Sequence, residues 1–545
     1  MKRSSCVVIS GLFFLLGMTS SFACTNLLVT KGASADGSVV ICYTCDGEFH
    51  PILRYTPAAD YEPGDSLEIT DWSGKVRGTI DQVRHTYAKV RLINEHQLAI
   101  GETTFEGREE LRNPEGLLHY WDLMQLALER AKTAREAIHI MTGLVDEYGY
   151  RSTGESFSLG DPEETWIMEM IGPGPGGKGA IWVALRIPDG YISCHANKAR
   201  IGSFPLDDPD NCLYSPNVIT FATEKGFYDP TSGEPFRFCE AYCPRTPKNR
   251  RYADARVWSL FQRAAPSQEF SPDYHRAVEG AEPYPLWIKP DQPLSMSDIF
   301  SLMRDHYEGT EFDMTKGIDA GPHGTPNRWR PITWEVDGVE YAWERPISTQ
   351  QTGFSFVSQS RSWLPDPVGG VLWYGVDDTY TTCYVPLYCG IEAVPTSYTV
   401  GSLSEFTWES AWWVFNFVAN FANLRYADMI VDIQAVQKDL EETMLALQPT
   451  VEQAAVDLAG SDPELLTRYL TDYSGSRGEL VVQRWRELGE CLIAKYNDGY
   501  VQEKEGDPVE RGYPEDWYRT VVQSRADQFR LKPKEEGVPE SKLVD

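Results

Sequence analysis

Short apolar runs separated by turn residues dominate the first 200 positions of the chain. Residues 24–34 read CTNLLVTKGAS, and a second apolar run, VVICYTC, follows the turn pair Asp36-Gly37. An Asp-Gly pair between two apolar runs is typical of a β-hairpin. Further strands are predicted at 97–102, 165–171, 180–187 and 190–196, the last three as an antiparallel meander joined by Gly- and Pro-rich turns.

Helical spacing of apolar residues appears in three other regions. The pattern predicts one helix over 117–148, with Thr142-Gly143 as a point of interruption, and a shorter helix near 297–306. The region 407–500 is mainly helical by the same criterion. Residues 203–290 are rich in Pro, Asp and aromatic residues and are interpreted as a long, ordered insertion. Strands followed by helices predict an α+β fold or a layered sandwich.

Composition narrows the class of protein. The chain has 545 residues, of which 42% are hydrophobic and 24% charged, as in globular proteins. Its 50 Lys and Arg against 80 Asp and Glu give a formal net charge of −30. Such a charge repels phosphate backbones, so nucleic acid is excluded as a partner.

The N-terminus has the pattern of a signal peptide. Lys2 and Arg3 precede an apolar stretch at 7–18, and Ser21-Phe22-Ala23 places small residues at −3 and −1 of a cleavage point. The stretch is short for a membrane span. We therefore expect residues 1–23 to be removed, the protein to be periplasmic or extracellular, and the mature chain to have no transmembrane segment. The remaining chain divides into a domain at 24–506 and a loosely held tail at 507–545.

Several other motifs carry little chemistry. The run at 172–179, GPGPGGKG, lies between two strands and reads as a hairpin loop rather than a phosphate loop. No H-E-x-x-H or G-x-S-x-G motif occurs. The sequence offers no convincing zinc ligand set, and the acidic cluster at 207–210 reads as a solvated loop.

Of the eleven cysteines, the pairs Cys239/Cys243 and Cys383/Cys389 are close enough for local disulfides, although sequence does not determine pairing.

Cys24 stands immediately after the predicted cleavage point. Cleavage would give it a free α-amine, which has a pKa close enough to neutrality to accept a proton. One residue would then supply both the nucleophile and the general base. Two other readings stay open: Cys24 is an ordinary strand cysteine, or it is the lipidated first residue of a lipoprotein. Ser21 at −3 and Phe22 at −2 disfavour lipidation.

The mature chain resembles the dipeptidase-A-like cysteine peptidases, which belong with the secernins to the N-terminal nucleophile hydrolases. The resemblance rests on Cys24-Thr25-Asn26 with the Asp36-Gly37 turn and on several longer blocks. These are HANKARI (195–201), HYEGTEFDMTKG (306–317), GPHGTPNRW (321–329), ERPIS (344–348), SQSRSWLPDPVGGVLW (358–373) and SAWWVFNFVAN (410–420).

The resemblance implies a four-layer αββα sandwich with two stacked antiparallel sheets and C-terminal helices. It implies hydrolysis of dipeptides with broad specificity, without a metal or an organic cofactor. Three further site residues are carried over: Asp46 contacts the amine of the nucleophile, Asn197 binds the oxyanion, and Arg361 lies close to the nucleophile. Tyr43 departs from the pattern, because relatives often carry Arg at that position.

Alternatives remain at the level of substrate and role. The same chemistry would serve an amidase for bile-salt-like or penicillin-like acyl amides, and a lipidated Cys24 would indicate a ligand-binding lipoprotein without catalysis. If the base were not the amine, His195 is the first candidate for a Cys–His pair. The sequence leaves a homo-oligomer open.

Overall fold

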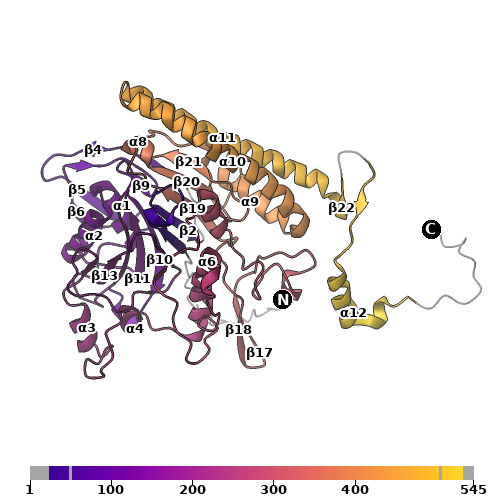
Figure 1. The fold of residues 1–545 in the computed structure, drawn as a ribbon, viewed down its shortest axis with the longest axis horizontal. Helices are drawn as coiled ribbons and strands as arrows, with labels where there is room; N and C mark the ends of the chain where they lie inside the picture. The colour runs from indigo at the N-terminus through magenta and orange to yellow at the C-terminus, as the bar shows by residue number, and fades with distance from the viewer. Residues whose placement is uncertain (1–23, 48–51, 503–505, 532–545) are drawn as a thin grey trace, which may run out of the picture.

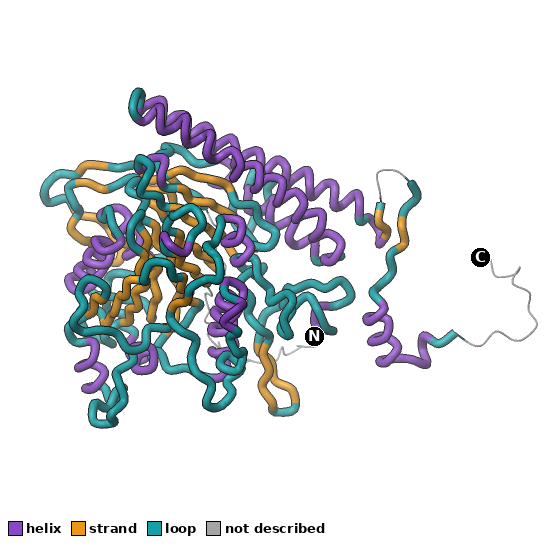
Figure 2. Tube along the Cα trace, in the orientation of Figure 1, coloured by secondary structure: helices purple, strands orange, loops and turns teal. Residues whose placement is uncertain are grey.

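The computed structural model describes residues 24–47, 52–502 and 506–531 (Figure 1). The predicted signal peptide, 1–23, and the end of the predicted tail lie outside these residues. Strands fill the body of the molecule and long helices run along one side of it (Figure 2). Among the described residues, no helix combines the length and the apolarity that crossing a membrane would require.

The first large sheet is built around the N-terminal hairpin. Its seven strands are ordered β16-β14-β1-β2-β19-β20-β21, and every neighbouring pair is antiparallel. The strands are β1 (Thr25–Val29), β2 (Val40–Asp46), β14 (Ile192–His195), β16 (Trp287–Ile288), β19 (Thr352–Gln359), β20 (Val371–Val376) and β21 (Val385–Tyr388). The hairpin predicted from the Asp36-Gly37 turn is confirmed as β1 and β2.

The second large sheet has eight strands, ordered β15-β13-β12-β11-β10-β9-β8-β3 and again antiparallel throughout. These are β3 (Tyr55–Thr56), β8 (Lys89–Val90), β9 (Ile93–Asn94), β10 (Ala99–Glu106), β11 (Gly154–Gly160), β12 (Thr165–Ile171), β13 (Ile181–Arg186) and β15 (Cys212–Tyr214). The glycine-rich run at 172–179 is the loop that joins β12 to β13, as predicted.

The two sheets meet where β1 and β2 contact β10 and β11. Glycines permit this close approach. A Cβ atom on Gly101 of β10 would lie 2.6 Å from Asn26 Oδ1 of β1, and one on Gly160 of β11 would lie 2.7 Å from Ile41 Cγ1 of β2. The buried side chains of both sheets therefore form one continuous core.

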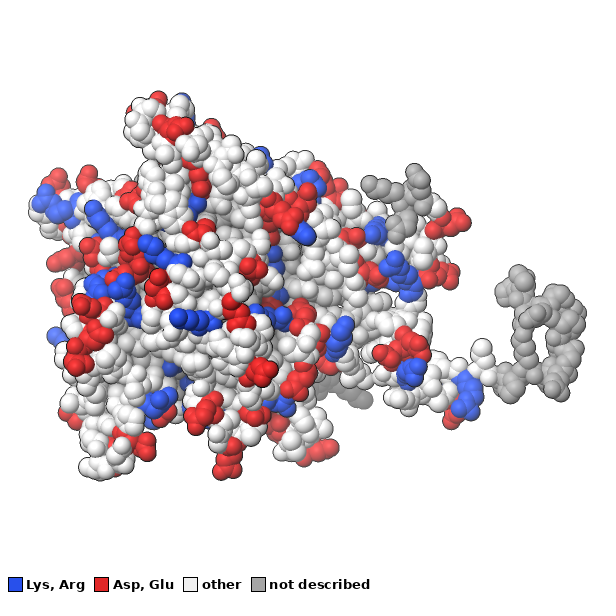
Figure 3. Space-filling model, in the orientation of Figure 1, with Lys and Arg blue, Asp and Glu red and all other residues white. Residues whose placement is uncertain are grey.

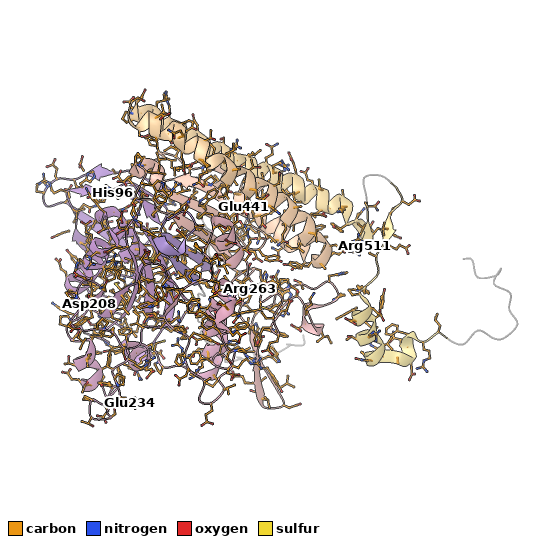
Figure 4. All side chains as sticks on the ribbon, viewed as in Figure 1. His96, Asp208, Glu234, Arg263, Glu441 and Arg511 are labelled. Atoms are coloured by element: carbon orange, nitrogen blue, oxygen red, sulfur yellow. The ribbon has the colours of Figure 1, made fainter. Side chains whose placement is uncertain are left out.

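Helices pack against both sheets. Contacts join α1 to β9 and β10, α2 to β11 and β12, α9 to β20, and both α10 and α11 to β21. Glu441 lies on α10 (Figure 4). Arg304, after α7, donates to both of its carboxylate oxygens at 2.9 and 2.6 Å. The helices are α1 (Tyr120–Arg130), α2 (Ala134–Tyr148), α3 (Val218–Glu224), α4 (Phe238–Tyr242), α5 (Pro247–Asn249), α6 (Ala255–Ala264), α7 (Met296–Leu302), α8 (Asp366–Gly369), α9 (Ala411–Ala422), α10 (Tyr426–Ala459), α11 (Pro463–Lys495) and α12 (Glu515–Phe529).

Two predictions about elements are wrong. The single helix expected over 117–148 is two helices, because Ala131 is extended and the Thr133 hydroxyl caps α2 by accepting from the Glu136 N–H. Thr142-Gly143 lies inside α2 without interrupting it. The expected three-strand meander also ends early: β12 and β13 pair, but β14 joins the first sheet beside β1.

The insertion at 203–290 contains more regular structure than its composition suggests. It includes β15, β16, α3 to α6 and one turn of π-helix, η3 (Arg250–Asp254), directly before α6. The described part of the tail carries α12, none of whose residues is buried. The remaining strands form the small two-stranded sheets β4 (Ala59–Asp60) with β7 (His85–Thr86), β5 (Ser66–Thr70) with β6 (Val76–Asp81), β17 (Thr333–Val336) with β18 (Val339–Ala342), and β22 (Tyr500–Val501) with β23 (Val509–Glu510).

Candidate active site

Cys24 lies at the start of β1, at the edge of the contact between the two sheets. The next residue, Thr25, pairs with Thr44 of β2, and its N–H donates to the Thr44 hydroxyl at 3.0 Å. The Cys24 Sγ lies 3.7 Å from both Tyr43 Oη and Glu102 Oε1. Cys24 is 1% exposed, so its thiol is surrounded by protein.

Asp46 ends β2, two residues beyond the strand position that faces Thr25. Arg345 Nη2 forms an ion pair with Asp46 Oδ2 at 2.5 Å, and the Thr352 hydroxyl donates to Oδ1 at 2.6 Å. The Thr44 hydroxyl lies 3.3 Å from Oδ2. Asp46 is therefore held near the start of β1, and its contact with the Cys24 amine stays a prediction.

Arg256 of α6 connects Cys24 to Asn197. Its Nη1 donates to the Cys24 carbonyl oxygen at 2.7 Å and to the Thr25 hydroxyl at 2.9 Å. Its Nη2 donates to Asn197 Oδ1 at 2.9 Å. Because a guanidinium group is planar and rigid, its two neighbouring nitrogens hold Cys24 and Asn197 at a fixed position relative to each other.

Asn197 follows β14 in a left-handed backbone conformation, with φ of 59°, which asparagine tolerates better than most residues. Its Nδ2 donates to the Thr104 carbonyl at 2.9 Å. Asn197 and Thr104 line a cavity of about 370 Å³. Basic side chains also line this cavity, namely Lys198, Lys248, Arg251 and Arg330.

The surroundings of Cys24 disfavour a resting thiolate. Burial raises the pKa of the Cys24 thiol well above its ordinary value, and neighbouring Cys45, Glu102 and Asp46 raise it further. Glu102 is itself shifted: burial raises the pKa of its carboxyl group to about 7, although hydrogen bonds, the first from Tyr43, lower it. The Cys24 thiol is therefore protonated near pH 7.

Family models identify the class of protein. The model for Peptidase family C69 matches residues 53–439, more than half of the chain. The chain belongs to peptidase family C69. The match begins after Cys24 and Asp46, so these two residues are placed by the geometry alone.

Curated relatives of this C69 peptidase are similar over most of their length. A "Probable dipeptidase" from Salmonella dublin is 27% identical over 402 residues, covering 69% of this chain and 83% of the relative. A "Probable dipeptidase" from Latilactobacillus sakei is 25% identical over 478 residues, covering 82% and 92%. "Dipeptidase A" from Lactobacillus helveticus is 23% identical over 427 residues, covering 74% and 82%.

His195 of the C69 peptidase does not pair with Cys24. Its Nδ1 lies 2.7 Å from the Thr103 hydroxyl and its Nε2 lies 2.7 Å from the Ser158 hydroxyl. Burial, with a contribution from Arg200, lowers the pKa of His195 to about 3. Both ring nitrogens thus serve to join β14 to the second sheet, and the side chain is neutral near pH 7.

Arg361 lies far from Cys24, so the expectation that it neighbours the nucleophile is wrong. Ser360 pairs with Val39, at the opposite end of β2 from Cys45. Val39 and Cys45 are six residues apart along the extended chain, which is about 20 Å. Arg361 instead forms an ion pair with Glu452 of α10 at 2.7 Å and donates to the Val368 and Gly369 carbonyls. Its role there is to hold α10 against the sheet.

The cysteines after Cys24 are free thiols in the structure, including the four in the two local pairs. Cys243 Sγ donates to the Phe105 carbonyl and Cys389 Sγ to the Asp366 carbonyl, so neither points at its supposed partner. Within the described ranges, no group of three or more His, Cys, Asp or Glu residues has the arrangement of a metal site.

Sequence reasoning missed Tyr43, Glu102, Arg256 and Arg345 as site residues. Each carried a weak signal. Glu102 is a charged residue in an apolar strand, Arg256 interrupts an apolar helix face, and Arg345 lies within the ERPIS block. Tyr43 was noted only because relatives often carry Arg at that position. Its hydroxyl donates to Glu102 Oε1 at 2.5 Å.

Proposed function

We propose that this protein is an exported cysteine dipeptidase of broad specificity, with the αββα sandwich of N-terminal nucleophile hydrolases. The hydrogen bonds of Arg256 to the Cys24 carbonyl and to Asn197 carry the proposal. They bring the residue after the predicted cleavage point to the amide expected to bind the oxyanion. The names of the curated relatives support dipeptides as the substrate class.

The reaction uses the freed N-terminus of the mature chain. The Cys24 thiol transfers its proton to its own α-amine while Sγ bonds to the scissile carbonyl carbon. The carbonyl π electrons move onto oxygen, where the Asn197 amide donates a hydrogen bond. Collapse of this intermediate breaks the C–N bond, and the leaving amine takes the proton from the Cys24 ammonium. Water then hydrolyses the thioester, releasing the N-terminal residue and restoring the thiol.

Asp46 has a positioning role in this scheme. Its carboxylate is fixed by Arg345 and Thr352 beside the start of β1, where a negative charge favours the protonated amine formed during attack. Of the basic residues along the cavity, Lys198, Lys248 and Arg251 already pair with glutamates, and Arg330 suits a substrate that ends in a free carboxylate. Both features fit a small peptide whose two ends are charged.

The first experiment is the intact mass of the exported protein, followed by an assay on dipeptides. We expect the chain to begin at an unmodified Cys24, and Cys24→Ala to reduce hydrolysis by at least about 10³-fold. Cys42→Ala is the matched control, because Cys42 is an equally buried thiol on β2. An acylated Cys24 would favour the lipoprotein, and hydrolysis of bile-salt-like or penicillin-like amides alone would favour the amidase.

A second variant tests the base. A chain that retains one Ala ahead of Cys24 has an amide in place of the amine, and amide nitrogen has no useful basicity. We expect this chain to fold and to be inactive. Full activity would place the base elsewhere.

A further inference from the structure

Glu102 presents a buried carboxyl group to the nucleophile, and the mechanism above does not use it. Its Oε1 accepts from the Tyr43 hydroxyl at 2.5 Å and lies 3.7 Å from the Cys24 Sγ. Its carboxyl group also hydrogen-bonds the carboxyl group of neighbouring Glu155, so the pair shares a proton. Glu102 is 1% exposed and Glu155 is fully buried.

This pair of carboxyl groups lacks a cation. Among the described residues, no Lys, Arg or His forms an ion pair with Glu102 or with Glu155. Burial raises the pKa of the Glu155 carboxyl well above its ordinary value, and Glu102 raises it further. A buried pair that shares one proton still carries one negative charge without a counter-charge, so a bound cation would be favoured here.

The position of Glu102 matches the geometry of a dipeptide under attack. The α-nitrogen of the first residue is two bonds from the scissile carbonyl carbon, or about 2.5 Å. When that carbon approaches Sγ to about 3–3.5 Å, the nitrogen lies within hydrogen-bond reach of a carboxylate oxygen on the same side of the sulfur. Glu102 Oε1, at 3.7 Å from Sγ, is such an oxygen.

Glu102 lies on β10 two residues from Thr104, which lines the cavity. Alternation along β10 places Glu102 and Thr104 on the same face of the strand, and Thr104 lines the cavity beside Asn197. A substrate whose carbonyl oxygen reaches Asn197 beside Thr104 therefore has Glu102 two residues, or about 7 Å, further along β10.

We propose that Glu102, held by the Tyr43 hydroxyl, binds the α-ammonium group of the substrate's first residue. This inference rests on the proposed function and deepens it. It makes the free amine a requirement, so acyl amides without an α-amine are poor substrates.

The test compares two substrates on three proteins. The substrates are Leu-Ala and its des-amino analogue, 4-methylpentanoyl-Ala, which differ only in the α-amine. The proteins are wild type, Glu102→Gln and Glu169→Gln. Glu169 is the matched control, because it is a fully buried carboxyl on β12 whose pKa burial also raises to about 7. It binds the N–H groups of Arg200 and Ile201, outside the site.

We expect wild type and Glu169→Gln to prefer Leu-Ala by at least about 100-fold in kcat/KM. In Glu102→Gln the preference should fall below about 10-fold, through loss of activity on Leu-Ala alone. Tyr43→Phe, which keeps the carboxyl and removes its hydrogen bond, should lower the preference by a smaller factor. This variant keeps the inference testable if Glu102→Gln fails to fold.

Two results would overturn the inference while leaving the proposed function intact. One is a wild-type enzyme that cleaves both substrates equally well. The other is a Glu102→Gln enzyme that loses the same factor on both, which would mean that Glu102 acts on Cys24 rather than on the substrate. A wild-type protein that cleaves no dipeptide would instead overturn the proposed function itself.

Discussion

Arg345 and Asp46 form an ion pair between side chains that are 2% and 1% exposed. The two residues are 299 positions apart in the chain. Their contact fixes the end of β2, next to the nucleophile, to the segment that leads into β19. The ion pair adds to the backbone pairing of β2 with β19 and to the Thr352 hydroxyl bond at the level of Cys24, so it contributes to stability and to the shape of the site.

Removal of one partner should be costly. Arg345→Met leaves the Asp46 charge buried without its counter-ion, and we expect the free energy of unfolding to fall by about 3–5 kcal/mol. The double variant Asp46→Asn/Arg345→Met should recover part of this loss. Urea denaturation at pH 7 measures both. The control is Arg486→Met, in an exposed pair with Glu490, where we expect a change below about 1 kcal/mol. Equal losses in Arg345→Met and Arg486→Met would contradict the prediction.

The raised pKa of the Cys24 thiol predicts slow alkylation. A thiol loses tenfold in thiolate for each unit by which its pKa exceeds the pH, and only the thiolate reacts. At pH 8, iodoacetamide should modify Cys24 at least about 10-fold more slowly than exposed Cys491. Peptide mass spectrometry gives both rates in one sample. In urea the two rates should converge, and a native Cys24 that reacts faster than Cys491 would refute the prediction.

His195 makes the fold sensitive to acid. Its pKa is about 3 in the folded protein against an ordinary value of 6.5, so the unfolded chain binds one more proton between these values. Its contribution to stability is complete above pH 6.5 and is lost as the pH falls toward 3, by up to about 1.4 kcal/mol per pH unit.

The slope of stability against pH tests this contribution. His195→Gln should be less stable than wild type at pH 7, yet lose less stability between pH 6.5 and pH 4.5. His85→Gln, at an exposed histidine, should follow the wild-type curve. Parallel curves for wild type and His195→Gln would show that the imidazole is not held neutral.

Two glycines should respond in opposite directions to the same substitution. Gly101→Ala places a Cβ 2.6 Å from Asn26 Oδ1, between the sheets and two residues from Cys24. We expect a loss of about 1–3 kcal/mol in the free energy of unfolding and a fall in kcat. Gly143→Ala, in α2 with open space around it, should add about 0.5–1 kcal/mol and leave kcat unchanged. Thermal unfolding and dipeptide assays distinguish the two, and a neutral Gly101→Ala would refute close sheet contact.

Local pattern predicted those parts of the fold that depend on neighbouring residues. The hairpin of β1 and β2 follows from one turn pair, and β12, β13 and the loop between them follow from their apolar and glycine-rich runs. Pairing between strands that are distant in the sequence leaves no such local signal in the turn residues or in the apolar runs. β14 joins β1 rather than β13, and its last residue, His195, contacts Thr103 and Ser158 of the second sheet, all partners that lie far away in the sequence.

The site was predictable only in part, for the same reason. Cys24 was found because a cleavage signal precedes it, and Asp46 and Asn197 followed from resemblance. Arg256 reaches Cys24 across 232 residues, and Glu102 across 78, distances over which spacing carries no information. The expected position of Arg361 was wrong because a motif was carried over without its place along the strand.

Acidic and basic side chains are interspersed over the face of the molecule in Figure 3, despite the net charge of −30. The visible face thus offers no single-sign field to draw charged ligands from a distance. Recognition of a substrate with charged ends therefore depends on short-range contacts inside the site.

The bonds of Arg256 to Cys24 also bear on how a newly cut chain end behaves. Chain termini ordinarily fray, because nothing beyond them holds the last residue in place. Here the carbonyl oxygen of Cys24 accepts a hydrogen bond from Arg256 of α6, and the N–H of Thr25 donates to Thr44 of β2. If residues 1–23 are removed as we propose, the peptide unit after the cleavage point is already held in the uncleaved chain, and the mature chain begins at a fixed first residue rather than a frayed one.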